Sequence, residues 1–68
     1  MYRVLRGEMF KKELSISKLA KMINVSEKTL RNKINGETDF TWNEVCKIHK
    51  IVNPKMSKDE LFRKDDAA

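Results

Sequence analysis

Hydrophobic residues recur every three or four positions along most of the chain, which is the spacing of one face of an α-helix. The sets are Leu5 and Met9, Leu19 and Ile23, Leu30 and Ile34, and Val45, Ile48 and Val52. No alternating apolar stretch is bounded by a hairpin turn, so the signals for strands are poor. The pattern therefore predicts an all-α fold in which these side chains turn inward.

Four hydroxyl residues stand where a helix should begin, each with an apolar residue directly before it and another four positions after it. They are Ser15, Ser26, Thr41 and Ser57. A hydroxyl at this position accepts a hydrogen bond from a free backbone N–H of the first turn, and the apolar pair packs across that turn. A glutamate three residues after Thr41 and after Ser57 predicts a full capping box at both places.

These starts and the apolar spacing predict five helices, over about residues 2–12, 16–23, 27–34, 42–51 and 58–64. Asn24 and the pair Asn35-Gly36 follow the second and third helices, where the chain needs the left-handed backbone that Asn and Gly tolerate best. The small Ala20 allows these two helices to approach closely. We expect one domain over residues 1–64 and a frayed tail over 65–68.

Composition excludes several classes of protein. A chain of 68 residues holds one domain at most and is too small for the pocketed scaffold of most enzymes. No apolar run approaches the roughly 20 residues that cross a bilayer, and the first residues lack the apolar stretch of a secretory signal. The single cysteine excludes an internal disulfide, so we expect a reduced, cytoplasmic setting without membrane attachment.

The net charge of +5 is distributed unevenly. Residues 1–36 hold nine basic and three acidic residues, a net charge of +6, whereas residues 37–68 carry −1. A basic half of this kind suggests a surface that faces a polyanion. A solvated, lysine-rich surface without a partner gives the same count, so both interpretations stay open on charge alone.

The remaining reactive side chains do not assemble a catalytic or metal site. Cys46 and His49 share a helical face, but two ligands without a second pair do not make a zinc site. A Cys–His nucleophile would also need an oxyanion pocket, for which there is no sign. We interpret Cys46 as a core or boundary residue and Trp42 as a packing residue. We expect no enzyme activity, cofactor, metal or small-molecule substrate.

Residues 19–30 read Leu-Ala-Lys-Met-Ile-Asn-Val-Ser-Glu-Lys-Thr-Leu, two short helical segments joined by a turn at Asn24 and Val25. This run, with residues 31–36 and 40–44, resembles the helix-turn-helix of the phage repressor/Cro family, the XRE-like group. The resemblance covers roughly residues 3–62 and implies a compact, five-helix, lambda repressor-like domain whose second and third helices form the helix-turn-helix. It also implies a transcriptional regulator that binds double-stranded DNA sequence-specifically.

Family members read bases with residues at the start of the third helix and again one turn later. The matching positions here are Glu27, Lys28 and Asn32, flanked by Thr29 and Arg31. By chemistry, Lys28 suits guanine, Asn32 suits adenine, and Glu27 suits the amino group of cytosine. The resemblance implies phosphate contacts at Ser15, Ser17, Lys18, Ser26 and Lys33. Ser15 and Ser26 have a competing role as helix caps.

Three features depart from the family pattern. Ile16 stands where many members have a Gln that touches phosphate. The loop Glu37-Thr38-Asp39 is acidic where relatives are commonly basic. Met9 and Ile34 stand where many relatives pair an Arg with a Glu, so an apolar contact takes the place of an ion pair.

The resemblance further implies a palindromic operator and a weak homodimer formed through residues 52–62. The apolar residues of that segment are Val52, Pro54, Met56, Leu61 and Phe62, and they could equally close the core of the monomer. The rival hypothesis is a helical protein-interaction module, antitoxin-like or an anti-repressor partner, with little DNA binding. The acidic loop and the missing Gln favour it slightly.

Overall fold

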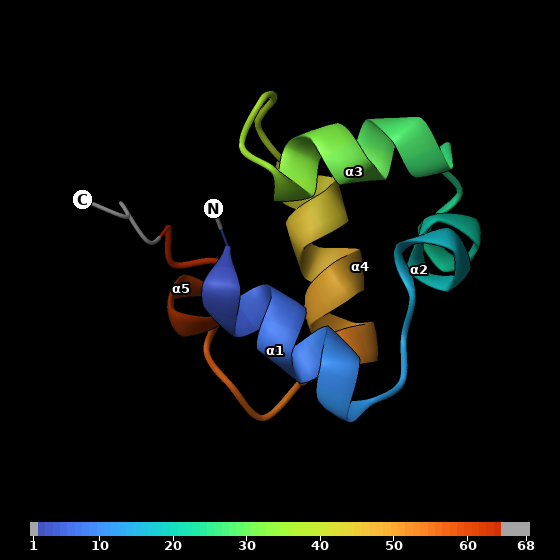
Figure 1. The fold of residues 1–68 in the computed structure, drawn as a ribbon. Coiled ribbons are helices and arrows are strands. Elements are labelled where there is room, and N and C mark those ends of the chain that lie inside the picture. Colours follow the sequence, from blue (N-terminus) through green and yellow to red (C-terminus); the bar gives the residue numbers. More distant parts are fainter. Residues whose placement is uncertain (1, 65–68) are drawn as a thin grey trace.

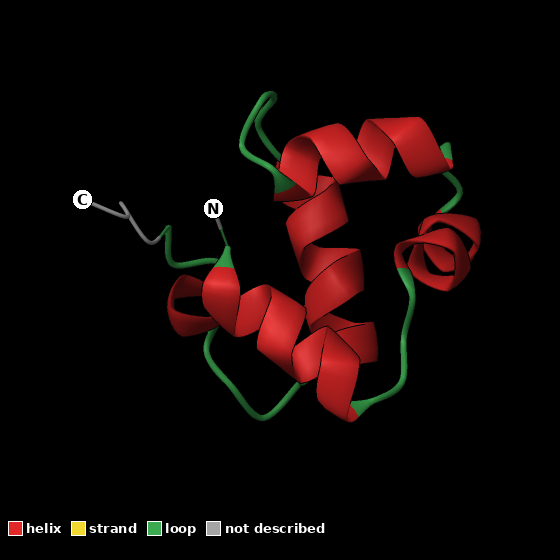
Figure 2. Cartoon of the chain, viewed as in Figure 1, coloured by secondary structure: helices red, strands yellow, loops and turns green. Residues whose placement is uncertain are grey.

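The computed structural model describes residues 2–64, and these form five helices with no strand among them (Figures 1 and 2). The helices are α1 (Arg3–Lys11), α2 (Ile16–Ile23), α3 (Glu27–Ile34), α4 (Trp42–Val52) and α5 (Lys58–Leu61). The all-α prediction is confirmed, and α2 and α3 have the predicted bounds. The largest difference is at α5, which ends at Leu61 rather than at residue 64. The tail predicted over 65–68 lies outside the described residues.

Helices α2 to α5 begin at the predicted hydroxyl caps. The side chains of Ser15, Ser26, Thr41 and Ser57 each accept a hydrogen bond from the backbone N–H three residues later. At Thr41 the capping box is complete, because Glu44 accepts from the Thr41 N–H at 2.8 Å. The second predicted box is wrong: at Ser57 the structure forms the hydroxyl bond without the reciprocal one.

A left-handed residue follows each of the first three helices within two positions. Asn24 (φ 62°) and Gly36 (φ 86°) were expected there, whereas Asn35 is right-handed. The third left-handed residue is Glu13 (φ 55°), the second residue after α1, where neither Gly nor Asn is present. The N–H groups of Glu13 and of the following residue donate back into the last turn of α1. The path from α1 to α2 thus imposes this conformation on Glu13 against its own preference.

Replacing Glu13 by glycine is expected to raise the free energy of unfolding by about 0.5 to 1 kcal/mol, measured by urea or thermal unfolding. A left-handed residue with a Cβ costs about 1–2 kcal/mol, and the greater freedom of glycine in the unfolded chain offsets part of the gain. Gly36→Ala is the matched control, expected to change stability in the opposite direction. A Cβ there meets nothing within 4 Å, so the control tests backbone conformation alone. Destabilisation by Glu13→Gly would contradict the prediction.

The core surrounds α4, which packs against α1, α2 and α5, while α3 packs on α2 (Figure 1). The fully buried side chains are Leu5, Leu19, Leu30, Ile34, Ile48, Val52 and Leu61. All the residues predicted to turn inward are buried except Val45, which is half-buried. Three rings in edge-to-face contact, those of Tyr2, Phe40 and Phe62, join the start of α1 to the end of α5.

Residues 52–62 contribute to the core of the monomer. Val52 and Leu61 are fully buried, and Met56 and Phe62 pack against the same core, so that Pro54 is the exposed apolar residue of the segment. Of the two roles considered for these side chains, pairing of two copies and closing the core of the monomer, the structure shows the second. Their burial follows from the position of α5, which packs on both α1 and α4.

The interpretation of Trp42 as a packing residue is wrong. Its side chain is 68% exposed in the first turn of α4, and the ammonium of Lys58 lies 5.5 Å from the ring centroid. The core-facing side of α4 carries Val45, Ile48 and Val52, and Trp42 lies about a quarter turn away from that side, so its ring is in solvent. Cys46 is half-buried, in agreement with a boundary position.

Candidate nucleic-acid interface

The helices α2 and α3 pack against each other across a turn of three residues, Asn24 to Ser26 (Figure 1). The left-handed Asn24 reverses the chain, and Val25 packs against the core from inside the turn. Ala20, on the packed side of α2, is only 2% exposed, in line with its small side chain. The turn thus holds the start of α3 in a defined place relative to α2.

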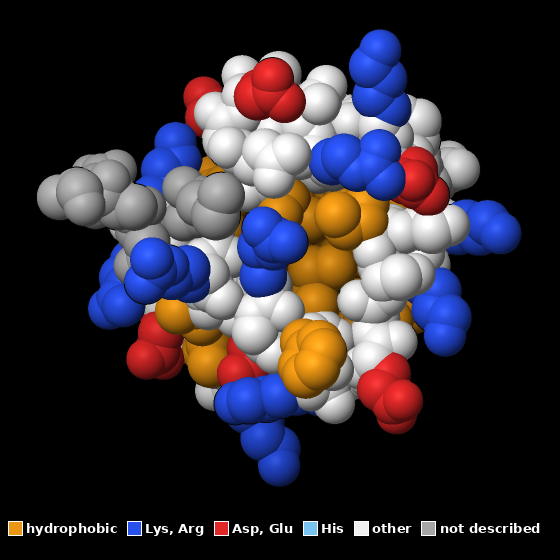
Figure 3. Space-filling model, in the orientation of Figure 1, with side chains coloured by type: hydrophobic (Ala, Val, Ile, Leu, Met, Phe, Trp, Pro, Cys, Tyr) orange, Lys and Arg blue, Asp and Glu red, His pale blue; other side chains and the backbone are white. Residues whose placement is uncertain are grey.

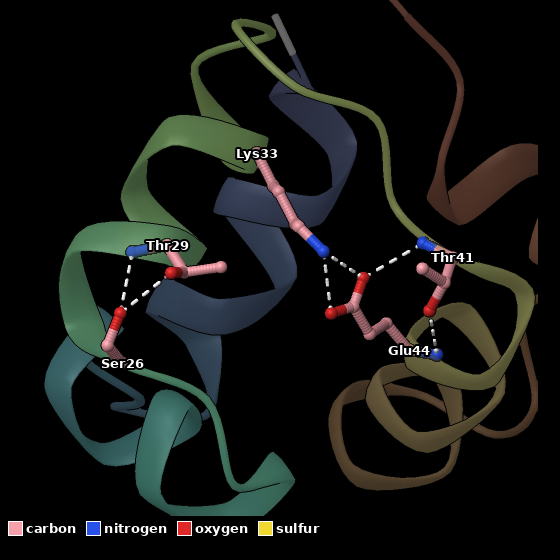
Figure 4. A network of polar contacts seen from close by, with 5 residues as sticks. All are labelled: Ser26, Thr29, Lys33, Thr41 and Glu44. Atoms are coloured by element: carbon pink, nitrogen blue, oxygen red, sulfur yellow. Dashed lines mark hydrogen bonds and ion pairs between the residues drawn. The ribbon is translucent and has the colours of Figure 1, made fainter.

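The outward side of α3 carries the residues predicted to read bases. Glu27, Lys28, Thr29 and Arg31 are exposed, and Asn32 is half-buried. Within residues 2–64, the side chains of Lys28 and Asn32 have no hydrogen-bond or ion-pair partner. The hydroxyl of Thr29, by contrast, accepts from the Ser26 hydroxyl at 2.7 Å (Figure 4). Lys28 and Asn32 are therefore the two uncommitted polar side chains of this helix, and their spacing of four residues puts them on one face.

Glu27 and Arg31 form an ion pair along α3, with Nη2 of Arg31 2.6 Å from Oε2 of Glu27. The hydrogen bond from Arg31, together with the Ser17 hydroxyl on α2, holds the pKa of Glu27 below its ordinary value. An exposed pair of this kind contributes little to stability. The pair does bring a carboxylate next to the guanidinium. Because the Ser17 hydroxyl is close enough to lower the pKa of Glu27, the starts of α2 and α3 are neighbours.

Four of the five residues predicted to contact phosphate are exposed at the starts of α2 and α3. Ser15 and Ser26 act as caps, each accepting a backbone hydrogen bond at 3.1 Å. Ser17 and Lys18 lie exposed in the first turn of α2. A helix start offers unpaired N–H groups and the positive end of the helix dipole, so the two neighbouring starts favour an anion on this side.

Lys33, the fifth of these residues, is turned inward to Glu44 on α4 (Figure 4). Its Nζ lies 2.5 and 2.6 Å from the two carboxylate oxygens, and its side chain is 12% exposed. The ammonium therefore does not lie on the outward side of α3, and we do not count Lys33 among the candidate phosphate contacts. Local spacing along the sequence does not reveal this pair, whose members are eleven residues apart.

The carboxylate of Glu44 connects two helices, because the same group binds Lys33 at the end of α3 and the Thr41 N–H at the start of α4 (Figure 4). Burial raises the pKa of Glu44, but the hydrogen bonds from Lys33 and Thr41 outweigh it and hold the pKa below the ordinary value. The sequence pattern predicted the contact of Glu44 with the Thr41 N–H, which caps α4. It did not predict the contact of Glu44 with Lys33, which orients α3.

A second polar contact holds α1 against the end of α4. Glu8, 9% exposed, accepts from Nδ2 of Asn53 and from Nζ of Lys11, both at 3.1 Å. The hydrogen bond from Lys11 lowers the pKa of Glu8, while burial acts in the opposite direction and the bond from Asn53 adds to the lowering. Glu8 is thus satisfied inside the protein and does not offer its charge to a partner.

Other kinds of site find no support in the part of the chain that the structure describes. No group of three His, Cys, Asp or Glu side chains there could hold a metal ion. No helix within residues 2–64 is both long and apolar enough to cross a membrane. Comparison of the chain with protein-family models, with curated proteins and with solved structures finds no match. The function is therefore inferred from the geometry and charge of the surface just described.

Proposed function

We propose that this chain is a small Cro/repressor-like transcriptional regulator that binds double-stranded DNA sequence-specifically, with α2 and α3 as its helix-turn-helix and α3 in the major groove. The observation that carries the proposal is the outward face of α3, where Lys28 and Asn32 lie one turn apart without partners inside residues 2–64. The major groove admits an α-helix, and these are residue types that bond to guanine and adenine edges there.

Contacts to the DNA backbone are proposed for the residues at the two helix starts. Lys18 supplies a charge, and Ser15, Ser17 and Ser26 supply hydroxyls beside free N–H groups. A palindromic operator bound by two weakly paired copies remains part of the proposal. Because Val52 and Leu61 are committed to the core of the monomer, pairing through 52–62 is limited to its exposed residues such as Pro54.

The deciding experiment is selection of binding sites from random duplex DNA with the purified chain, followed by affinity measurements over a range of salt concentrations. We expect a consensus site whose affinity falls steeply as salt rises, with a log–log slope of about −0.9 for each phosphate neutralised. A selected palindrome would report pairing on DNA. Absence of any duplex binding at low salt would contradict the proposal and favour the helical protein-interaction module.

Glu27→Gln is expected to strengthen binding about tenfold at low salt to duplexes in which Glu27 contacts no cytosine, because it removes a repulsive charge and releases Arg31 from its carboxylate. Where Glu27 accepts from cytosine, the preference for that base should weaken. Glu37→Gln is the matched control, since it makes the same charge change in the exposed loop after α3. Fluorescence anisotropy with labelled duplexes measures both. Equal gains in the two variants would assign the effect to net charge and contradict a role for Glu27.

A further inference from the structure

An open apolar groove lies where α1, the start of α2 and the end of α3 meet, with a volume of about 170 Å³. Its lining residues are Arg6, Met9, Phe10, Leu14, Ile16 and Ile34. Figure 3 shows hydrophobic side chains exposed in a hollow between α1 below and α3 above, with Lys and Arg side chains and some Asp or Glu side chains around it. Met9 and Ile34 are almost fully buried, whereas Phe10 projects into solvent and is 84% exposed.

The groove is suited to side chains of a larger partner. Pockets that enclose small molecules usually measure about 300–1,000 Å³, so this smaller hollow has room for one or two bulky side chains instead. Single exposed apolar residues are common on protein surfaces. Phe10 differs because it stands on α1 directly beside an apolar hollow, an arrangement typical of a surface that an amphipathic helix covers.

The charges around Phe10 indicate the chemistry of the partner. Exposed cations on and just after α1 are Arg3, Lys11 and Lys12, of which Lys11 already pairs with Glu8, and Arg6 lines the groove itself. Among residues 3–14, Glu8 is buried against Asn53 and Lys11, so Glu13 is the exposed carboxylate of that segment. On α3 the carboxylate of Glu27 is also exposed, but Arg31 pairs with it. A second copy of the chain would press like charges together, and a DNA duplex offers few apolar groups to fill a hollow.

We infer that the groove docks an acidic amphipathic segment of another protein. A bulky aliphatic or aromatic side chain of that segment enters the hollow beside Phe10, and its carboxylates face the cations of α1. The docking goes beyond DNA binding and does not depend on it. Since Ile16 directly follows the Ser15 cap, the docked segment lies beside the start of α2.

The test is selection of peptides of about 12 residues, roughly three helical turns, from a random displayed library against the intact chain. We expect the selected peptides to combine Asp or Glu with large apolar residues spaced three or four apart. Nuclear magnetic resonance titration with a synthetic selected peptide should shift the signals of Phe10, Leu14 and Ile16. Phe10→Ala should weaken binding at least tenfold. Met22→Ala is the control, since it removes an exposed apolar side chain outside the groove.

The inference would be overturned if no peptide were selected, if the peptides lacked acidic enrichment, or if the signal shifts centred away from the groove. It would also be overturned if Phe10→Ala bound the peptide as well as the original chain, or if both variants weakened binding equally. Phe10→Ala is expected to fold, because the side chain is almost entirely in solvent; an unchanged thermal unfolding curve checks this. If Phe10→Ala instead lowered the affinity for duplex DNA with no effect on peptide binding, the occupant of the groove would be DNA. If the same variant lost self-association, the occupant would be a second copy of the chain.

Discussion

Glu44→Gln is expected to lower the free energy of unfolding by about 2 to 3 kcal/mol, because it leaves the ammonium of Lys33 without its counter-charge. The Lys33 side chain is only 12% exposed, so water replaces the lost contact poorly. Glutamine keeps the length of the side chain and an oxygen that can accept from the Thr41 N–H. The lost stability therefore measures the ion pair with Lys33 more than the cap of α4. A domain of this size has about 3–5 kcal/mol in total, and urea unfolding should show a large shift of the midpoint.

Glu60→Gln is the matched control for this effect. Glu60 occupies the same place relative to Ser57 as Glu44 does to Thr41, but it is exposed and has no ion pair within residues 2–64. We expect a change within about 0.5 kcal/mol. Adding Lys33→Met to Glu44→Gln should restore part of the stability, since the unpaired buried charge is then removed. Additive losses would contradict a direct interaction between the two residues.

The dependence on pH gives an independent measurement of the same contact. The folded protein holds the pKa of Glu44 below its ordinary value of 4.5, so the carboxylate stabilises the fold fully above that pH. The contribution is lost as the pH falls through the lower pKa of the folded state. The stability difference between the original chain and Glu44→Gln should therefore shrink in acid. A difference that stayed constant from neutral pH to below the folded pKa would contradict the ionic contribution.

Asn32→Ala is expected to weaken binding to the selected duplex about 5- to 150-fold and to relax the base preference at one position. A bidentate contact from Asn to adenine is worth about 1–3 kcal/mol of discrimination, which corresponds to that range. The Asn32 side chain makes no hydrogen bond within residues 2–64, so its truncation breaks no internal bond. Anisotropy measurements on the selected site and its single-base variants provide the readout.

Lys18→Ala is the contrasting variant for Asn32→Ala. Lys18 lies at the start of α2 and is proposed to contact phosphate, so its loss should weaken all duplexes alike and reduce the salt slope by about one unit. Unchanged base preferences in Asn32→Ala would show that this side chain does not read bases, and the assignment of α3 as the recognition helix would lose its main support.

Features that depend on a few neighbouring residues were predictable from the sequence. The caps at Ser15, Ser26, Thr41 and Ser57 formed as predicted, and α2 and α3 have the predicted bounds, because a cap bond joins residues only three apart. The spacing of apolar residues likewise identified most of the core. The exposed positions of Lys28 and Thr29 followed from the same periodicity, since they lie on the side of α3 away from Leu30 and Ile34.

The sequence by itself therefore determined the five helices, the buried face of most of them and the outward face of α3. Only the tertiary structure decided that Lys33 turns inward to Glu44, that Glu8 binds Asn53 across the domain, and that Trp42 is exposed. It also imposed left-handed backbone on Glu13. The physical reason is that helix starts and periodicity are set by neighbours along the chain. Long-range pairing, burial of a particular ring and the shape of the groove depend on which helices meet, and no local spacing encodes that.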